Sequence, residues 1–183
     1  MRPLKKYVII FQGLLEYPRE QEWFEFKANW FEPNALGEYI SALANAAAYH
    51  GRDFGYFVWG IEDKTHAIVG TDFDQTQEIK HEPLAHYLER QLTPDTAFAF
   101  HELEMEGKRI VLLEIAAAKT VPTAFANVRY FRIGTSLDVR PAYIDVPGRP
   151  GFKLIVMQFD GWVHGMRPYT FHGCPYWRVE SRC

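Results

Sequence analysis

Cysteine is scarce in this sequence. Its 183 residues include 2 cysteines, Cys174 and Cys183, and both fall in the last ten residues. A small secreted domain that depends on disulfides needs more cysteines than this, distributed through its core. We therefore expect no disulfide framework, and the composition favours the cytoplasm as the compartment.

Long apolar runs are also missing. A membrane-spanning helix needs about 20 consecutive apolar residues, and no such stretch occurs. Residues 1–11 are basic and then apolar, like the start of a signal peptide, but Gln12 and Gly13 interrupt the run and no small-residue cleavage site follows. We expect no membrane partner and interpret this start as a short packing element.

An excess of positive charge is absent as well. The net charge is −3, and acidic residues outnumber basic ones in residues 1–136, whereas the opposite holds in residues 137–183. This balance excludes a protein that coats nucleic acid by bulk charge, although a local basic face stays compatible with it. Apolar residues make up 48% of the chain, which is enough for a buried core.

No phosphate-binding loop is present. Such a loop requires G-x-x-x-x-G-K-[ST] between a strand and a helix. The pair Gly107-Lys108 is followed by Arg109 and lies in a predicted hairpin turn. We therefore expect no nucleotide cofactor and no ATP hydrolysis.

The pattern of apolar residues predicts an α+β domain. Alternation predicts a strand at 22–27, and Pro33 and Gly51 are suited to begin and end a helix. The order of the later elements is a central strand at 54–61, a short strand at 67–69, a helix at 78–92, a hairpin of strands at 98–106 and 109–115, and a strand at 129–133. Together they predict a single mixed β-sheet packed with two main helices.

Beyond residue 137 the pattern changes. Glycines, prolines and aromatic residues dominate, and the one clear strand is at 153–159. We expect two parts, a domain over 1–136 and an irregular C-terminal extension over 137–183 whose fold the sequence does not define.

Five segments resemble the Schlafen AlbA domain and occur in the family's order. They are residues 22–27, 37–45, 55–63, 66–71 and 130–135. In animal Schlafens this resemblance implies a metal-dependent RNA-cleaving site with two glutamates and an aspartate, and the matching positions are Glu20, Glu25 and Asp63. Glu22 and Glu62 are near neighbours of these positions. Carboxylates are suitable ligands for Mg²⁺ or Mn²⁺, so one of these ions is the cofactor that the resemblance implies.

In bacterial members the same domain is often attached to a winged helix and described as a transcriptional regulator. This chain departs from that pattern after Arg140, where a charged helix usually follows. The C-terminal extension is therefore interpreted as a lineage-specific ending or as the remnant of a longer protein.

Basic residues near these segments are candidates for contact with nucleic acid, because cations beside aromatic rings suit a single-stranded backbone and its bases. The candidates are Lys27, Arg52, Lys64, Arg129, Arg132 and Tyr130. The first hypothesis is a regulatory or defence-related module that binds RNA or DNA. The alternatives are a metal-dependent endoribonuclease using Glu20, Glu25 and Asp63, and an oligomerisation or scaffold domain whose aromatic extension forms a homo-oligomer interface.

Overall fold

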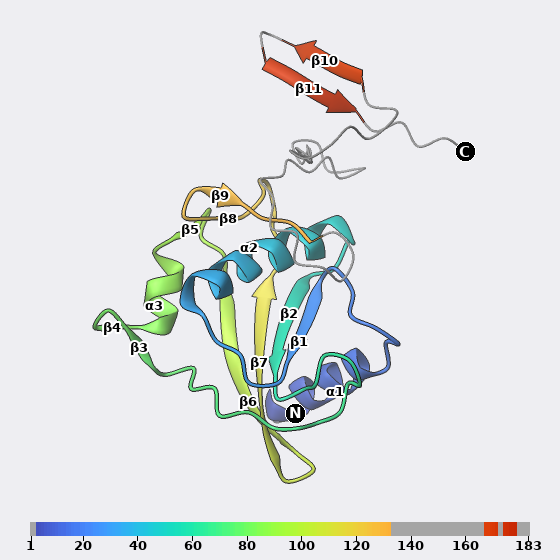
Figure 1. Cartoon of the computed structure of the whole chain (residues 1–183), viewed down its shortest axis with the longest axis vertical. Coiled ribbons are helices and arrows are strands. Elements are labelled where there is room, and N and C mark those ends of the chain that lie inside the picture. Colours follow the sequence, from blue (N-terminus) through green and yellow to red (C-terminus); the bar gives the residue numbers. More distant parts are fainter. Residues whose placement is uncertain (1–2, 133–166, 172–173, 179–183) are drawn as a thin grey trace.

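A four-stranded mixed sheet organises the molecule (Figure 1). The computed structural model describes residues 3–132, 167–171 and 174–178. In spatial order the strands of the sheet are β1 (Phe24–Lys27), β2 (Phe54–Trp59), β7 (Lys108–Ala116) and β6 (Phe98–Met105). β1 and β2 are parallel, and the other two pairings are antiparallel. The predicted α+β class with a mixed sheet is therefore confirmed.

Helix α2 (Pro33–Tyr49) lies across one face of this sheet (Figure 1). The Glu32 carboxylate caps its first turn by accepting hydrogen bonds from the backbone N–H groups of Asn34 and Ala35, at 3.2 and 2.5 Å. Its inward alanines are fully buried, and this lack of bulk brings the helix close to β2. Gly51, with φ of 64°, ends it as the sequence predicts.

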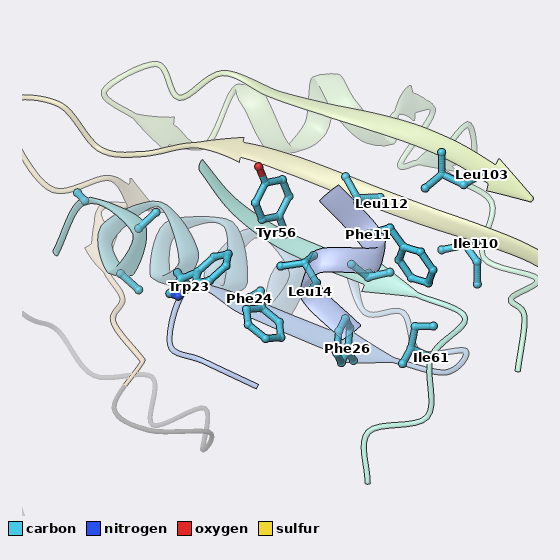
Figure 2. Packing of buried hydrophobic residues seen from close by; sticks show 14 of the residues in the cluster. Phe11, Leu14, Trp23, Phe24, Phe26, Tyr56, Ile61, Leu103, Ile110 and Leu112 are labelled. Atoms are coloured by element: carbon cyan, nitrogen blue, oxygen red, sulfur yellow. The ribbon is translucent and has the colours of Figure 1, made fainter. Parts of the chain in front are cut away.

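Helix α1 (Pro3–Leu15) covers the opposite face. Figure 2 shows Phe11 and Leu14 of this helix directed at the apolar side chains of the sheet, among them Phe24 and Leu112. The start of the chain, interpreted as a packing element, is thus an amphipathic helix with its buried stripe on the sheet. Among the described residues, no helix has both the length and the apolar character to cross a membrane.

The hairpin between β6 and β7 has the predicted turn. Glu106 and Gly107 both have positive φ, 52° and 70°, as a tight two-residue turn requires. β2 is the predicted central strand, with β1 and β7 on either side.

The predicted helix at 78–92 is wrong over most of its length. Only α3 (Leu84–Glu89) is helical, flanked by β3 (Glu78–Ile79), β4 (Glu82–Pro83) and β5 (Leu92–Thr93). Lys80 and His81 have positive φ and turn β3 back onto β4, and Pro83 cannot lie inside a helix without loss of a hydrogen bond.

The strands predicted at 129–133 and 67–69 are shortened. β9 (Val128–Arg129) pairs with β8 (Ala124–Phe125), which also pairs with β5. Ser41 and Asn45 of α2 take over the backbone groups of Tyr130 and so end β9 early. The strand at 67–69 is reduced to one bridge between Ile61 and Ile68.

In the C-terminal part, β10 (Arg167–Phe171) and β11 (Cys174–Arg178) form an antiparallel pair. The strand predicted at 153–159 lies outside the described residues, so it stays a prediction, as does the boundary between the two predicted parts.

Candidate functional site

Two parallel strands bring the candidate residues to one edge of the sheet. Lys27 is the last residue of β1, and Asp63 follows β2. Since β1 and β2 run in the same direction, their carboxyl ends meet. The Lys27 Nζ atom lies 2.9 Å from Asp63 Oδ2. We call the residues at this end, Lys27, Asn29, Trp30, Asp63 and Lys64, the carboxyl edge.

Glu25 shares a face of β1 with Lys27, because side chains alternate along a strand. The Glu25 side chain is almost fully buried, and its Oε1 atom lies 2.5 Å from Lys27 Nζ. The Tyr39 hydroxyl of α2 donates a hydrogen bond to the same oxygen at 3.3 Å. Glu25 is therefore held from both the strand and the helix.

Glu20 and Arg132 complete the cluster along the outer side of β1. Arg132 Nη2 lies 2.6 Å from Glu25 Oε2 and 3.3 Å from Glu20 Oε2. Glu20 Oε1 accepts the Phe26 N–H at 2.5 Å, and Arg132 Nη1 donates to the Phe24 carbonyl at 2.6 Å. We call the six residues the carboxylate network: Glu20, Glu25, Lys27, Tyr39, Asp63 and Arg132.

Burial shifts the proton affinities inside this network. Burial and the neighbouring Glu25 charge raise the pKa of Glu20 to about 7, against the opposing effects of the Phe26 N–H and Arg132. Burial and the Glu25 charge also raise the pKa of Tyr39 to about 12, so its hydroxyl stays a donor at neutral pH. For Lys27, burial opposes the charged form, but the Glu25 and Asp63 carboxylates outweigh it and raise its pKa.

The three carboxylates expected to bind metal do come together through shared cations. Glu20 and Glu25 share Arg132, and Glu25 and Asp63 share Lys27. Their oxygens are of the type that Mg²⁺ and Mn²⁺ prefer. In this arrangement, however, they neutralise two basic side chains. No group of three or more His, Cys, Asp or Glu side chains in the described part of the chain is placed to hold a metal ion.

The near neighbours of these carboxylates have other contacts. Glu22 Oε2 lies 2.6 Å from His50 Nε2, and Glu62 accepts a hydrogen bond from the Thr65 hydroxyl at 3.0 Å. Neither is part of the carboxylate network.

The structure separates the residues expected to contact nucleic acid. Lys27 and the exposed Lys64 lie at the carboxyl edge. Arg52 precedes β2 and is therefore at the opposite end of the sheet, where it stacks on Trp23 at 4.7 Å from the ring centre. Arg129, half-buried, lies on β9 beside α2.

Two of these residues have structural contacts. The Tyr130 hydroxyl donates to Glu38 at 3.4 Å, and the Tyr130 backbone is bonded to α2. Arg132 was predicted to contact nucleic acid, which requires a position at the surface. Its side chain is instead fully buried and pairs with Glu20 and Glu25.

Sequence reasoning missed Tyr39. It lies among apolar residues on the inward face of α2, where a tyrosine is an ordinary core residue. The role of Arg132 was missed as well, since it is 107 positions after Glu25 and no local pattern connects them. Only the packing of the last described part of the domain against β1 brings them together.

Two solved structures are similar to this chain at low sequence identity. The chain is 19% identical to the DIP2311 protein of Corynebacterium diphtheriae, with a TM-score of 0.48 over 72% of this chain and 26% of that one. It is 21% identical to the N-terminal domain of a RecG-related protein from Nitrosomonas europaea, with a TM-score of 0.42 over 74% of this chain and 92% of that domain. The chain thus spans about a quarter of the length of the C. diphtheriae protein.

No curated protein matches the sequence. The family described as "Schlafen, AlbA_2", by contrast, matches residues 20–140, which is more than half of the chain and includes the whole carboxylate network. The chain is a member of the Schlafen AlbA_2 family.

Proposed function

We propose that this protein binds nucleic acid at the carboxyl edge. The observation that carries the proposal is the position of the exposed Lys64, next to Asp63, the ion-pair partner of Lys27, at the joint end of β1 and β2 within the family domain. The exposed Lys64 offers charge for a phosphate, and the half-buried Trp30, which follows β1 at the same end, is an aromatic candidate for base stacking.

The carboxyl edge is held in place before any ligand arrives. The Trp59 indole N–H donates to the Trp30 carbonyl at 2.6 Å, and Asn29 Oδ1 accepts the Thr71 hydroxyl at 2.9 Å. These bonds tie the loop after β1 to β2 and to the segment beyond it. A fixed surface loses little conformational entropy on binding, which favours affinity.

The test is the affinity of Lys64→Ala for labelled single-stranded RNA and DNA at several salt concentrations. The control is Lys119→Ala, because Lys119 is also exposed but follows β7, whose carboxyl end lies at the opposite end of the sheet. Loss of one phosphate contact should weaken binding and reduce the salt slope by about 0.7. Equal affinities for the two variants would contradict the carboxyl edge as the binding surface.

A second candidate function is metal-dependent cleavage of RNA. The observation in its favour is the convergence of Glu20, Glu25 and Asp63, which come from before β1, from β1 and from after β2. As described, Lys27 and Arg132 occupy the space between these carboxylates. A divalent ion therefore does not fit unless a basic side chain withdraws.

Cleavage is tested by incubating the protein with labelled structured RNA in Mn²⁺ and, separately, in EDTA. Asp63→Asn is the variant, and Asp72→Asn, which changes an exposed aspartate outside the network, is the control. An enzyme would cut in Mn²⁺ only, and Asp63→Asn alone would lose the activity. Intact RNA retained by all three proteins would support binding without cleavage, and oligomers without affinity for nucleic acid would support a scaffold.

A further inference from the structure

A second polar cluster lies on the other face of the sheet, beneath α1. Lys6 Nζ lies 3.5 Å from Glu114 Oε2 of β7, and the Tyr7 hydroxyl lies 3.5 Å from Glu114 Oε1. His101 of β6 stacks on the Tyr7 ring, with 3.5 Å between centroids and 18° between planes. None of these residues belongs to the carboxylate network.

His101 is placed where a charged imidazole is unfavourable. Its Nε2 atom is buried and has no hydrogen-bond partner among the described residues. A protonated imidazole has two N–H donors, and a buried donor without an acceptor is costly. Burial lowers the pKa of His101, Glu114 opposes this change and Lys6 adds to it.

The other titratable groups around this cluster give little compensation. Glu114 Oε1 accepts from Tyr7, and Glu114 Oε2 lies 3.5 Å from Lys6 Nζ without a hydrogen-bond partner among the described residues. The Glu114 charge favours a protonated His101, but it does not bond the His101 Nε2 atom and does not offset the cost of burial. Tyr56 of β2 is nearby, and burial together with the Glu114 charge raises its pKa to about 12, so it carries no charge at neutral pH. The Lys6 charge also lowers the pKa of His101, because it repels a second positive charge.

Helix α1 is also separate from the family domain in sequence. The family match begins at residue 20, after the last residue of α1. Among the α1 side chains whose burial is described, residues 5–15, only Phe11 and Leu14 are fully buried, and Figure 2 shows them over the apolar face that contains Phe24, Phe26 and Leu112. Removal of α1 from this position would expose that face.

We propose that α1 is a pH-sensitive cover of the sheet, which protonation of His101 loosens. Above the ordinary pKa of histidine the neutral ring stacks on Tyr7 and α1 is closed. At lower pH the charged ring lacks an acceptor inside the contact, so the open state of α1 becomes more populated. Phe11 and Leu14 still favour the closed state, and the expected effect is more frequent opening rather than full release.

The test is hydrogen exchange of the α1 backbone amides in the full chain at pH 5 and pH 8, corrected for the intrinsic pH dependence of exchange. The variant is His101→Phe, which keeps a ring against Tyr7 but cannot be protonated, and the control is His86→Gln, at an exposed histidine of α3. Wild type and control should show several-fold more opening at pH 5, and His101→Phe should show equal opening at both. The same pH effect in His101→Phe would overturn the proposal.

A second measurement uses the reciprocity of linked equilibria, in case His101→Phe folds poorly. Leu14→Ala weakens the apolar contact of α1, so it should move the NMR titration midpoint of His101 upward toward that of a free histidine. An unchanged midpoint in a Leu14→Ala protein with more open α1 would show that His101 and α1 are not coupled, and would also overturn the proposal.

Discussion

At the outer edge of β1, two side chains form the hydrogen bonds that the backbone of a further strand would otherwise form. Glu20 accepts the Phe26 N–H, and Arg132 donates to the Phe24 carbonyl, so backbone groups that a further strand would bond are already satisfied. An edge covered in this way cannot pair with another chain. The same two side chains are joined to each other and to Glu25, so the edge and the candidate site are one structure.

Glu20→Gln tests the proton affinity of this edge. The folded protein raises the pKa of Glu20 to about 7, so it binds a proton more tightly than the unfolded chain does. The contribution of Glu20 to the free energy of unfolding therefore decreases as pH rises from about 4.5 to about 7, by at most about 3 kcal/mol. Urea denaturation across this range should show the decrease in wild type and not in Glu20→Gln. Glu16→Gln, at an exposed residue, should behave as wild type, and a Glu20→Gln curve parallel to wild type would contradict the shift.

At the scale of elements, the contact between α2 and β2 sets the geometry of the domain. A Cβ atom at Gly55 of β2 would lie 2.7 Å from the backbone carbonyl oxygen of Leu43 in α2. Helix and strand therefore meet backbone to backbone, which the buried alanines of α2 also permit. Asn45 of the same helix bonds Thr123 and Tyr130 and so attaches the segment after β7 to this pair.

Gly55→Ala should destabilise the protein by about 1–3 kcal/mol, because neither backbone can move without loss of packing. Gly13→Ala is the matched change in α1, where the added Cβ meets nothing within 4 Å. It should stabilise the helix by about 1 kcal/mol. Thermal unfolding of both variants decides the matter, and a Gly55→Ala protein as stable as wild type would mean that the close contact is not required.

On the scale of the whole molecule, the two ends of the sheet have different chemistry. The carboxyl edge has Lys27, Lys64 and the acidic partners of Lys27. The opposite end has Arg52, which stacks on Trp23 and donates to the Tyr17 hydroxyl at 3.2 Å. The six residues of β2 separate these ends by roughly 20 Å.

Arg52→Ala should therefore leave the affinity for single-stranded RNA and DNA within about twofold of wild type, because Arg52 is too far away to contact a ligand at the carboxyl edge. Loss of a phosphate contact at that edge should weaken binding by more than this. Fluorescence anisotropy alongside Lys64→Ala makes the comparison. If Arg52→Ala weakened binding more than Lys64→Ala, the ligand would lie at the other end of the sheet and the proposed surface would be misplaced.

Local chemistry was sufficient for much of the fold. Pro33 is suited to the first turn of α2 because its ring fixes φ near the helical value. Gly51 is suited to end the helix because glycine tolerates the left-handed conformation that follows it. Glu106 and Gly107 define the hairpin between β6 and β7, because both adopt the positive φ that a two-residue turn requires. Alternation in β1 puts Glu25 and Lys27 on one face, so this part of the site could also be predicted from the sequence.

Contacts between distant segments decided the rest. Arg132, predicted at a surface, is buried because the outer edge of β1 offers two carboxylates and a carbonyl that need a donor. Tyr39 joins the site only because α2 crosses β1 at Glu25. The sequence by itself determined the elements that depend on neighbouring residues, and the tertiary structure decided which charges are paired, since pairing depends on distances that no local pattern contains.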